Sequence, residues 1–263
     1  MKNKLFWVII AAVTFVLMLW INGVSNTGWI NDTNMKMVSD QFQNLFTPAG
    51  YAFSIWGLIY LGLALFLGYV ITKRVQNKPS FVDDNTLKLF TLINVVNTVW
   101  IVLWLHYEPG YSLLLMLALL GLLIAILIRQ KMCLEDSKLS SFIFLQWPFS
   151  LYLGWIIAAT IANAAAFLTD LGWTGGSFGE TTWTIVVIIV AVGIYMFMII
   201  KRNTRLLGLV GVWALVAVAS RNFEANDWVA NAAVAGAVII GLTTAVHGFL
   251  NREKTPFRKE KMS

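Results

Sequence analysis

The sequence is short of charge, proline and cysteine. Only 12% of its 263 residues are Asp, Glu, Lys or Arg, whereas soluble domains carry about 25%. With 59% hydrophobic residues and a mean hydropathy of +0.74, most of the surface has to face lipid, which excludes a soluble domain. The single cysteine, Cys133, excludes an intramolecular disulfide. The net charge of +6 does not indicate nucleic-acid binding, because the basic residues lie in small groups between apolar runs.

Eight apolar runs are long enough to cross a membrane as helices, which takes about 20 residues each. We expect these helices at residues 5–23, 48–72, 87–107, 111–128, 140–168, 182–200, 206–220 and 228–250. The seventh run is the shortest, and Arg205 and Arg221 at its two ends can extend toward opposite membrane surfaces. The sequence therefore predicts an all-α integral membrane protein with eight transmembrane helices.

The placement of basic residues predicts the orientation, because cytoplasmic loops collect Lys and Arg. With a cytoplasmic N-terminus, 17 of the 19 basic residues fall on the cytoplasmic side. The other two, Lys36 and Arg221, fall outside together with seven acidic residues: Asp32, Asp40, Glu108, Asp170, Glu180, Glu224 and Asp227. We therefore expect both termini in the cytoplasm, and a bacterial inner membrane fits this topology.

The first run follows Lys2 and Lys4, so a cleaved signal peptide is the alternative interpretation. Its apolar stretch is long for a signal peptide, and residues 21–26 contain no small-x-small cleavage site, so we expect this helix to be retained. Cleavage would leave seven helices, as in retinal proteins. No lysine lies in the middle of any run, however, so there is no candidate for a Schiff base.

The polar residues within the runs are amides and hydroxyls: Asn94, Asn97, Gln146, Thr160 and Asn163. No Asp, Glu or Lys lies at mid-span, which argues against a proton- or sodium-coupled transporter, because such proteins keep a carboxylate near the midplane. Each of these amides and hydroxyls serves either interhelical hydrogen bonding or ligand contact. His106 and His247 lie near opposite ends of their runs, too far apart to be the two axial ligands of one haem.

Eleven of the twelve tryptophans fall into two groups. Those near the ends of runs fit the aromatic belt at membrane surfaces: Trp7, Trp20, Trp29, Trp104, Trp173, Trp183 and Trp228. Deeper in their runs lie Trp56, Trp100, Trp155 and Trp213, where a large ring packs against a helix or a ligand. Three stripes with helical spacing combine rings with polar groups, namely Trp56 with Tyr60; Asn97 with Trp100 and Trp104; and Tyr152 with Trp155, Ala159 and Asn163. They indicate either an aromatic cleft for a flat, largely apolar molecule or a helix-packing core.

Three blocks of these residues resemble the TspO family, the tryptophan-rich sensory proteins related to the mitochondrial translocator protein. Residues 48–60, PAGYAFSIWGLIY, resemble the family's second-helix pattern at Pro48, Trp56 and Tyr60, and depart from it at Gly50 and Ser54. Residues 97–100, NTVW, resemble the third-helix pattern N-x-x-W. Residues 152–163, YLGWIIAATIAN, resemble the fifth-helix pattern, with alanine at 158 and 162 where the family has phenylalanine and leucine.

The resemblance covers about the first 165 residues. It implies a TspO-like five-helix membrane domain over 1–168, followed by a three-helix extension over 169–263. It also implies a membrane-embedded sensor or carrier that requires no cofactor and binds a tetrapyrrole such as protoporphyrin or haem, or a sterol. Carried over by motif, the ligand-binding residues would be Phe53, Trp56, Tyr60, Asn97, Trp100, Trp155, Ala159 and Asn163.

Two parts of the chain remain open to alternative interpretations. The segment 24–47 contains Met35, Met37, Phe42, Leu45 and Phe46, so it is either a lid over the cleft or a disordered loop. The last three runs carry no motif. Their small residues at four-residue spacing, Ala232 with Gly236 and Ala237 with Gly241, permit close packing. This part can dock on the bundle, take the place of a homodimer partner or form a second site.

Catalysis has little support in the sequence. There is no Ser/His/Asp set, no metal-ligand cluster and no phosphate loop, so we expect a protein that is not an enzyme, with photo-oxidative turnover of a bound porphyrin left open. The alternative functions are a small-solute permease and an assembly subunit that has no small-molecule ligand.

Overall fold

The computed structural model describes residues 5–134 and 138–252. Within these residues, eight helices are long and apolar enough to cross a membrane. They are α1 (Phe6–Val24), α3 (Ile55–Val75), α4 (Asp84–Leu105), α5 (Pro109–Arg129), α7 (Trp147–Asp170), α8 (Gly179–Arg202), α9 (Arg205–Asn222) and α10 (Asp227–Leu250). The prediction of an all-α membrane protein with eight spanning helices is confirmed, and α9 is the shortest, with 18 residues.

Five shorter elements connect the long helices. They are α2 (Met35–Gln41), the 3-10 turn η1 (Gly50–Ser54), α6 (Leu139–Ser141), the π-helical turn η2 (Phe142–Gln146) and the 3-10 turn η3 (Gly176–Phe178). Side-chain caps fix where some helices begin. The Asn34, Asp83 and Asn226 side chains each accept a bond from a backbone N–H three residues later, at 2.9–3.2 Å, and so start α2, α4 and α10.

The π-helical turn has a cause in the sequence. Pro148 has no backbone N–H, so it cannot bond to the carbonyl of Phe144 within a regular α-helix. The wider turn η2 lies directly before it and takes up this irregularity. On the facing helix α3, a Cβ at Gly62 would lie 3.2 Å from the Pro148 Cβ. The glycine therefore lets α3 pack closely against the start of α7.

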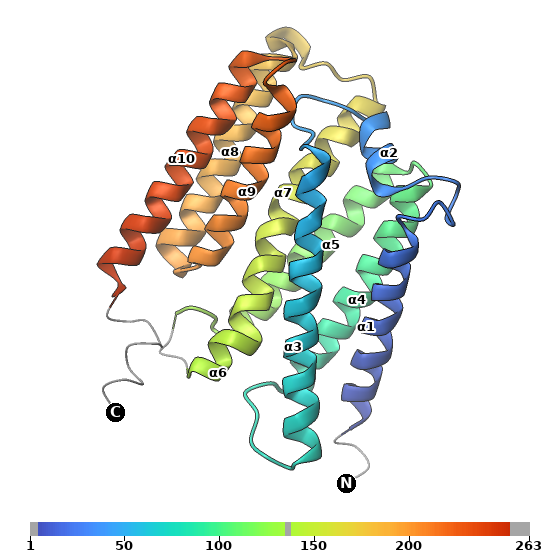
Figure 1. Ribbon diagram of the computed structural model, residues 1–263, viewed down its shortest axis with the longest axis vertical. Coiled ribbons are helices and arrows are strands. Elements are labelled where there is room, and N and C mark those ends of the chain that lie inside the picture. The colour runs from blue at the N-terminus through green and yellow to red at the C-terminus, as the bar shows by residue number, and fades with distance from the viewer. Residues whose placement is uncertain (1–4, 135–137, 253–263) are drawn as a thin grey trace.

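Helix α7 is the centre of the molecule, because it packs against α3, α5 and α9. Helix α4 lies between α1 and α5. Helices α8, α9 and α10 pack on one another, and α9 makes most of their contact with the rest (Figure 1). The expected boundary near residue 168 falls at the end of α7, and the two-domain division remains a proposal. The three C-terminal helices are docked on the bundle in this structure.

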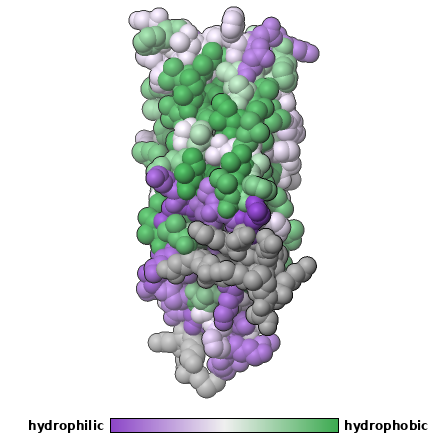
Figure 2. Space-filling model, turned by 90° about the vertical axis from the view of Figure 1, so that its left-hand side faces the viewer, coloured by the Kyte–Doolittle hydropathy of each residue, from purple (hydrophilic) through white to green (hydrophobic). Residues whose placement is uncertain are grey.

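The two ends of the molecule differ. The start of α1, the end of α10 and the connections α3–α4, α5–α7 and α8–α9 lie at one end, the lower one in Figure 1. We call it the basic end, because Lys73, Arg74, Lys201 and Arg202 lie there. We call the opposite end, where α2 lies, the lid end. On the face that Figure 2 shows, a broad apolar region extends from near the lid end toward the basic end. Exposed Leu, Ile, Val and Phe side chains of the long helices suit contact with lipid.

Glycines let α7, α8 and α9 approach one another closely. A Cβ at Gly154 on α7 would lie 2.9 Å from the Val210 Cβ and 3.1 Å from the Leu207 carbonyl oxygen, both on α9. From α8, the Tyr195 hydroxyl donates to the Gly154 carbonyl oxygen at 2.8 Å. The Tyr195 ring lies so close to Gly211 that a Cβ there would be 2.7 Å from it. The C-terminal helices are therefore held on the bundle at one tight seam.

We expect Gly154→Ala to destabilise the protein by about 1–3 kcal/mol, because the added methyl overpacks the seam between α7 and α9. Thermal unfolding in detergent measures this as a lower Tm, by roughly 2–4 °C per kcal/mol. The matched control is Gly121→Ala on α5, where nothing lies within 4 Å of the added Cβ. A Gly154→Ala protein that melts at or above the Tm of the control would show that the seam is not tight.

Candidate ligand-binding site

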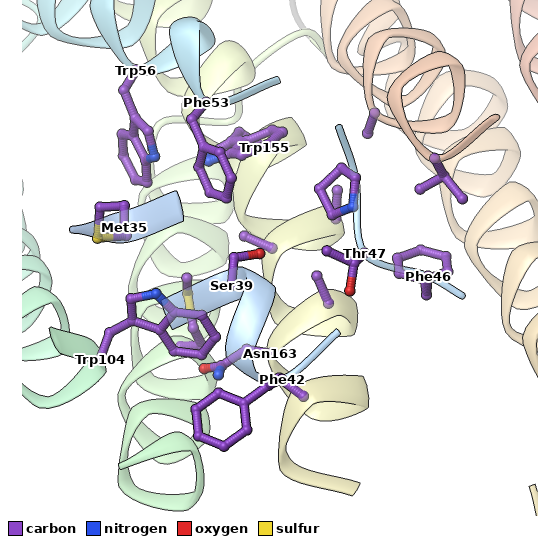
Figure 3. A pocket seen from close by; sticks show the side chains of 18 of the residues that line it. Met35, Ser39, Phe42, Phe46, Thr47, Phe53, Trp56, Trp104, Trp155 and Asn163 are labelled. Carbon is purple, nitrogen blue, oxygen red and sulfur yellow. The ribbon is translucent and has the colours of Figure 1, made fainter. Parts of the chain in front are cut away.

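A cavity lies near the lid end, between α3, α4, α7 and α9 and beneath α2 (Figure 3). The volume that the centre of a water molecule can occupy in it is about 60 Å³. One water needs about 10–15 Å³ by this measure, so the cavity is narrow in this conformation. It is lined by Met35, Ser39, Phe42, Phe46, Thr47, Pro48, Phe53, Trp56, Trp100, Trp104, Met116, Trp155, Ala158, Ala159, Ala162, Asn163, Ala166, Ala214 and Val218.

Five aromatic rings form a continuous wall of the cavity. The Trp56 ring centroid lies 6.1 Å from that of Trp100 and 6.4 Å from that of Trp155. The wall continues from Trp100 to Trp104 at 6.5 Å and from Trp155 to Phe53 at 6.1 Å. Rings at these separations attract one another, so each supports its neighbour's orientation. Flat apolar faces are therefore presented to whatever enters the cavity.

Another part of the lining consists of small side chains on two helices. Helix α7 contributes Ala158, Ala159, Ala162 and Ala166, and α9 contributes Ala214 and Val218. The alanines at 158 and 162 stand where the TspO pattern has larger residues, and here they border the cavity. Helix α9 belongs to the part of the chain that carries no motif, yet it completes the site.

Six of the eight residues predicted to bind a ligand line this cavity: Phe53, Trp56, Trp100, Trp155, Ala159 and Asn163. The other two, Tyr60 and Asn97, do not. They belong to a hydrogen-bonded chain that joins four helices. The Tyr60 hydroxyl donates to the Asn22 Oδ1, the Asn22 Nδ2 donates to the Asn97 Oδ1 at 3.1 Å, and the Asn97 Nδ2 donates to the Tyr152 hydroxyl at 2.9 Å.

This chain supports the cavity from behind. The Trp56 ring stacks on the Tyr60 ring at 5.4 Å and meets the Tyr152 ring edge-on at 5.6 Å. Tyr60 and Tyr152 are the two ends of the hydrogen-bonded chain, so it fixes the surface on which Trp56 rests. Asn97 bonds between helices, as one of the two interpretations of amide groups within the membrane has it. Asn163 lines the cavity, and ligand contact by it remains a prediction.

The structure adds residues that the motifs did not identify. Trp104 was assigned to the aromatic belt as well as to a stripe, and the belt assignment is wrong, because Trp104 is 7% exposed and lines the cavity. Its signal was present in the sequence, since it continues the stripe of Asn97 and Trp100. The contributions of α9 had no such signal, because Ala214 and Val218 lie in an apolar helix without a distinctive face.

Three lining side chains have buried polar atoms without a hydrogen-bond partner among the described residues. These atoms are the Trp100 Nε1, the Trp104 Nε1 and both the Nδ2 and the Oδ1 of Asn163. Most buried polar groups in proteins are paired, and an unpaired one costs about 1–3 kcal/mol. Polar atoms of this kind around an apolar cavity are typical of a ligand site.

The segment between α1 and η1, residues 25–49, is folded and covers the cavity; we call it the lid. Met35, Phe42 and Phe46 are buried and line the cavity. Of the two expectations for this segment, a lid and a disordered loop, the structure agrees with the lid. The Phe42 ring lies 6.1 Å from that of Trp104. Met37 instead points outward and is 51% exposed. The apolar residues of the lid thus divide between the cavity and the surface.

Helix α9 holds the lid in place. The Ala49 backbone N–H donates to the Ala217 carbonyl oxygen at 2.9 Å, and the Asn222 Nδ2 donates to the Leu45 carbonyl oxygen at 2.9 Å. The Arg221 guanidinium contacts the Asp40 Oδ1 at 2.8 Å. From α8, Glu180 accepts a bond from the Leu45 N–H at 3.2 Å. Several attachments of the lid therefore come from the C-terminal helices.

The ion pairs of the lid involve both of the basic residues that the charge pattern placed on the outer side. Asp40 contacts the Lys36 Nζ at 2.5 Å as well as Arg221. These two cations, with Lys36 first, lower the pKa of the Asp40 carboxyl below its ordinary value of 3.8. A carboxylate with a lowered pKa stabilises the folded state above its ordinary pKa and loses that effect as the pH falls through the lowered value. The ion pair thus persists at neutral and mildly acidic pH.

Neither histidine lines the cavity. His106 follows the end of α4, with its Nδ1 2.7 Å from the Val102 carbonyl oxygen, and His247 lies toward the basic end of α10. Haem in this cavity would therefore have no imidazole ligand from the described residues.

Comparison with known proteins finds a family match that covers nearly all of the helical part of the chain. The model of the family described as "TSPO-like protein" matches residues 8–246. No curated protein and no solved structure matches the chain. The matched region runs from α1 into α10, so it is longer than the 165 residues that carry the motifs and includes the helices that hold the lid.

We expect Asn97→Leu to lower the stability by about 1–2 kcal/mol, because it leaves the buried Tyr152 hydroxyl without this partner and removes one hydrogen bond of Asn22. The affinity of the folded protein for a cavity ligand should change less than twofold. Thermal unfolding and a ligand titration on the same sample measure the two effects. Thr98→Val is the control, since the Thr98 hydroxyl donates within its own helix, to the Asn94 carbonyl oxygen at 2.8 Å. Intact stability with lost binding would place Asn97 in the site itself.

Removing the Arg221 charge should loosen the lid. In Arg221→Met we expect amide hydrogen exchange at residues 40–47 to accelerate by roughly 2–10-fold, as for a partly exposed ion pair. Lys201→Met at the basic end serves as the control and should leave this exchange unchanged. Wild-type exchange, corrected for the intrinsic pH effect, should rise toward that of the variant as the pH falls through the lowered pKa of Asp40, because the carboxylate then becomes protonated. Equal exchange in all three proteins would contradict a lid held by Arg221.

Proposed function

Because the chain belongs to the family of TSPO-like proteins, we propose that it is a membrane-embedded binding protein, a sensor or carrier, for a flat hydrophobic molecule. The observation that carries this proposal is the cavity wall of Phe53, Trp56, Trp100, Trp104 and Trp155, which faces an apolar space closed by the lid. Aromatic walls with a few polar groups are typical of sites for planar ligands.

We further propose a ligand of tetrapyrrole type, or one of sterol type, as the TspO resemblance implies. The accessible space of about 60 Å³ is too small for such a molecule while the lid is closed, since ligand pockets usually enclose about 300–1,000 Å³. Binding therefore includes displacement of the lid. The lid is suited to this, because polar contacts at its edge hold it to α8 and α9.

Binding without catalysis is the simplest use of this lining. Its polar side chains are Ser39, Thr47, Asn163 and the tryptophans, and none of its described residues is His, Cys, Asp, Glu or Lys. We also propose that the basic end faces the cytoplasm, which places both termini inside, and that the membrane is a bacterial inner membrane. A homodimer remains a prediction.

The test is a titration of the detergent-purified protein with protoporphyrin IX and with its dimethyl ester, followed by quenching of tryptophan fluorescence. We expect saturable quenching by at least one of the two porphyrins. Ala159→Phe, which places a ring inside the cavity, should weaken binding at least tenfold, because one buried phenyl excludes ligand atoms from the narrow space. Ala64→Phe on α3 is the matched control, since Ala64 is exposed toward lipid, and it should bind like the wild type.

Quenching that does not saturate, or that is the same in both variants, would contradict the proposal. The cavity would then be a packing defect. An assembly subunit or a small-solute permease would become the better hypothesis.

A further inference from the structure

The polar groups of the cavity indicate which ligands it selects. Trp100, Trp104 and Asn163 are 4%, 7% and 3% exposed, and each has polar atoms without a partner among the described residues. Two of them are indole N–H groups, which only donate, and the third is an amide. The cavity therefore offers mainly donors, and their natural partner is an acceptor oxygen.

The charge of the lining is as informative as its donors. No described residue of the lining carries an ionisable acid or base. Two cations at the lid end, Lys36 on the lid and Arg221 on α9, are already engaged with Asp40, and none of the three lines the cavity. A carboxylate buried here would have hydrogen-bond donors but no counter-charge, and burying an uncompensated charge is very costly.

The donors also lie at a defined place. Trp104 is in the last turn of α4, and Asn163 faces the same cavity from α7 (Figure 3). Phe42 covers Trp104 from the lid, with ring centroids 6.1 Å apart. An acceptor oxygen bound to these donors would therefore lie beneath the lid, while the rest of a planar ligand lies against Trp56 and Trp155.

We propose that the cavity selects an uncharged planar molecule with carbonyl oxygens, which accept hydrogen bonds from Trp104 and Asn163, and that it rejects the same molecule as a carboxylate. This inference rests on the proposed function and narrows it. Among porphyrins it favours neutral forms and esters over molecules with ionised propionates. It also extends the ligand class to flat ketones and quinones, whose chemistry matches the same donors.

Three tricyclic probes of nearly equal shape test the inference: anthracene, 9,10-anthraquinone and anthraquinone-2-carboxylate. Calorimetric titration of the protein in nanodiscs measures their affinities. The signal from Ala159→Phe nanodiscs is subtracted to remove partition into lipid. We expect anthraquinone to bind the cavity about tenfold more tightly than anthracene, as two neutral hydrogen bonds allow, and at least tenfold more tightly than the carboxylate.

Two variants assign the donors. Trp104→Phe and Asn163→Leu keep the bulk of each side chain and should each weaken anthraquinone binding roughly 3- to 10-fold, with anthracene binding changed less than twofold. Trp228→Phe is the control, because Trp228 is 77% exposed on α10. The comparison of the three probes on the wild-type protein needs no variant, so it holds even where a variant fails to fold.

The outcomes separate this inference from the proposed function. Three results would each overturn the inference and leave the planar-ligand site in place. They are equal affinity for anthracene and anthraquinone, equal affinity for anthraquinone and anthraquinone-2-carboxylate, and equal weakening of both neutral probes in the two variants. Failure of all three probes to bind the wild type in excess of Ala159→Phe would overturn the proposed function and the inference together.

Discussion

The absence of water in the hydrocarbon region is the constraint on which this structure depends. Backbone groups have no partner there except one another, so the chain crosses the membrane only as helices. The same constraint applies to side chains and explains why Asn22 and Asn97 are joined with Tyr60 and Tyr152 across four helices. A polar group that remains unpaired in such surroundings is conspicuous. Those around the cavity define the site more clearly than its shape does.

The spans could be predicted from sequence because hydropathy and charge act locally. Each expected run lies within a few residues of a helix, and the deviations have local causes, such as the Asp83 cap that starts α4 before the apolar run begins. The π-helical turn before Pro148 was not predicted, although the missing N–H that accompanies it is visible in the sequence. What depends on one helix and its nearest residues was therefore predictable.

The site was predictable only in part, because it depends on contacts between helices that lie far apart in the sequence. Asn97 and Asn163 are the same residue type on similar stripes, and their roles differ because Asn22, which lies 75 residues from Asn97, faces one and not the other. Trp104 already belonged to the stripe of Asn97 and Trp100, and only the motif-based set of ligand-binding residues left it out. Ala214 and Val218 could not be predicted, because apolar residues on a helix do not reveal which neighbour they face. Long-range packing decides these cases, and a single sequence does not encode it in any short pattern.

The attachment of the lid to α9 has a thermodynamic consequence. Whatever stabilises the closed lid also stabilises the docking of α9, and linkage requires the two effects to be equal in free energy. Because α9 and α10 run from the lid end to the basic end, this linkage connects the lid to both ends of the molecule. A molecule that displaces the lid would therefore also loosen the docking of α9 on the bundle.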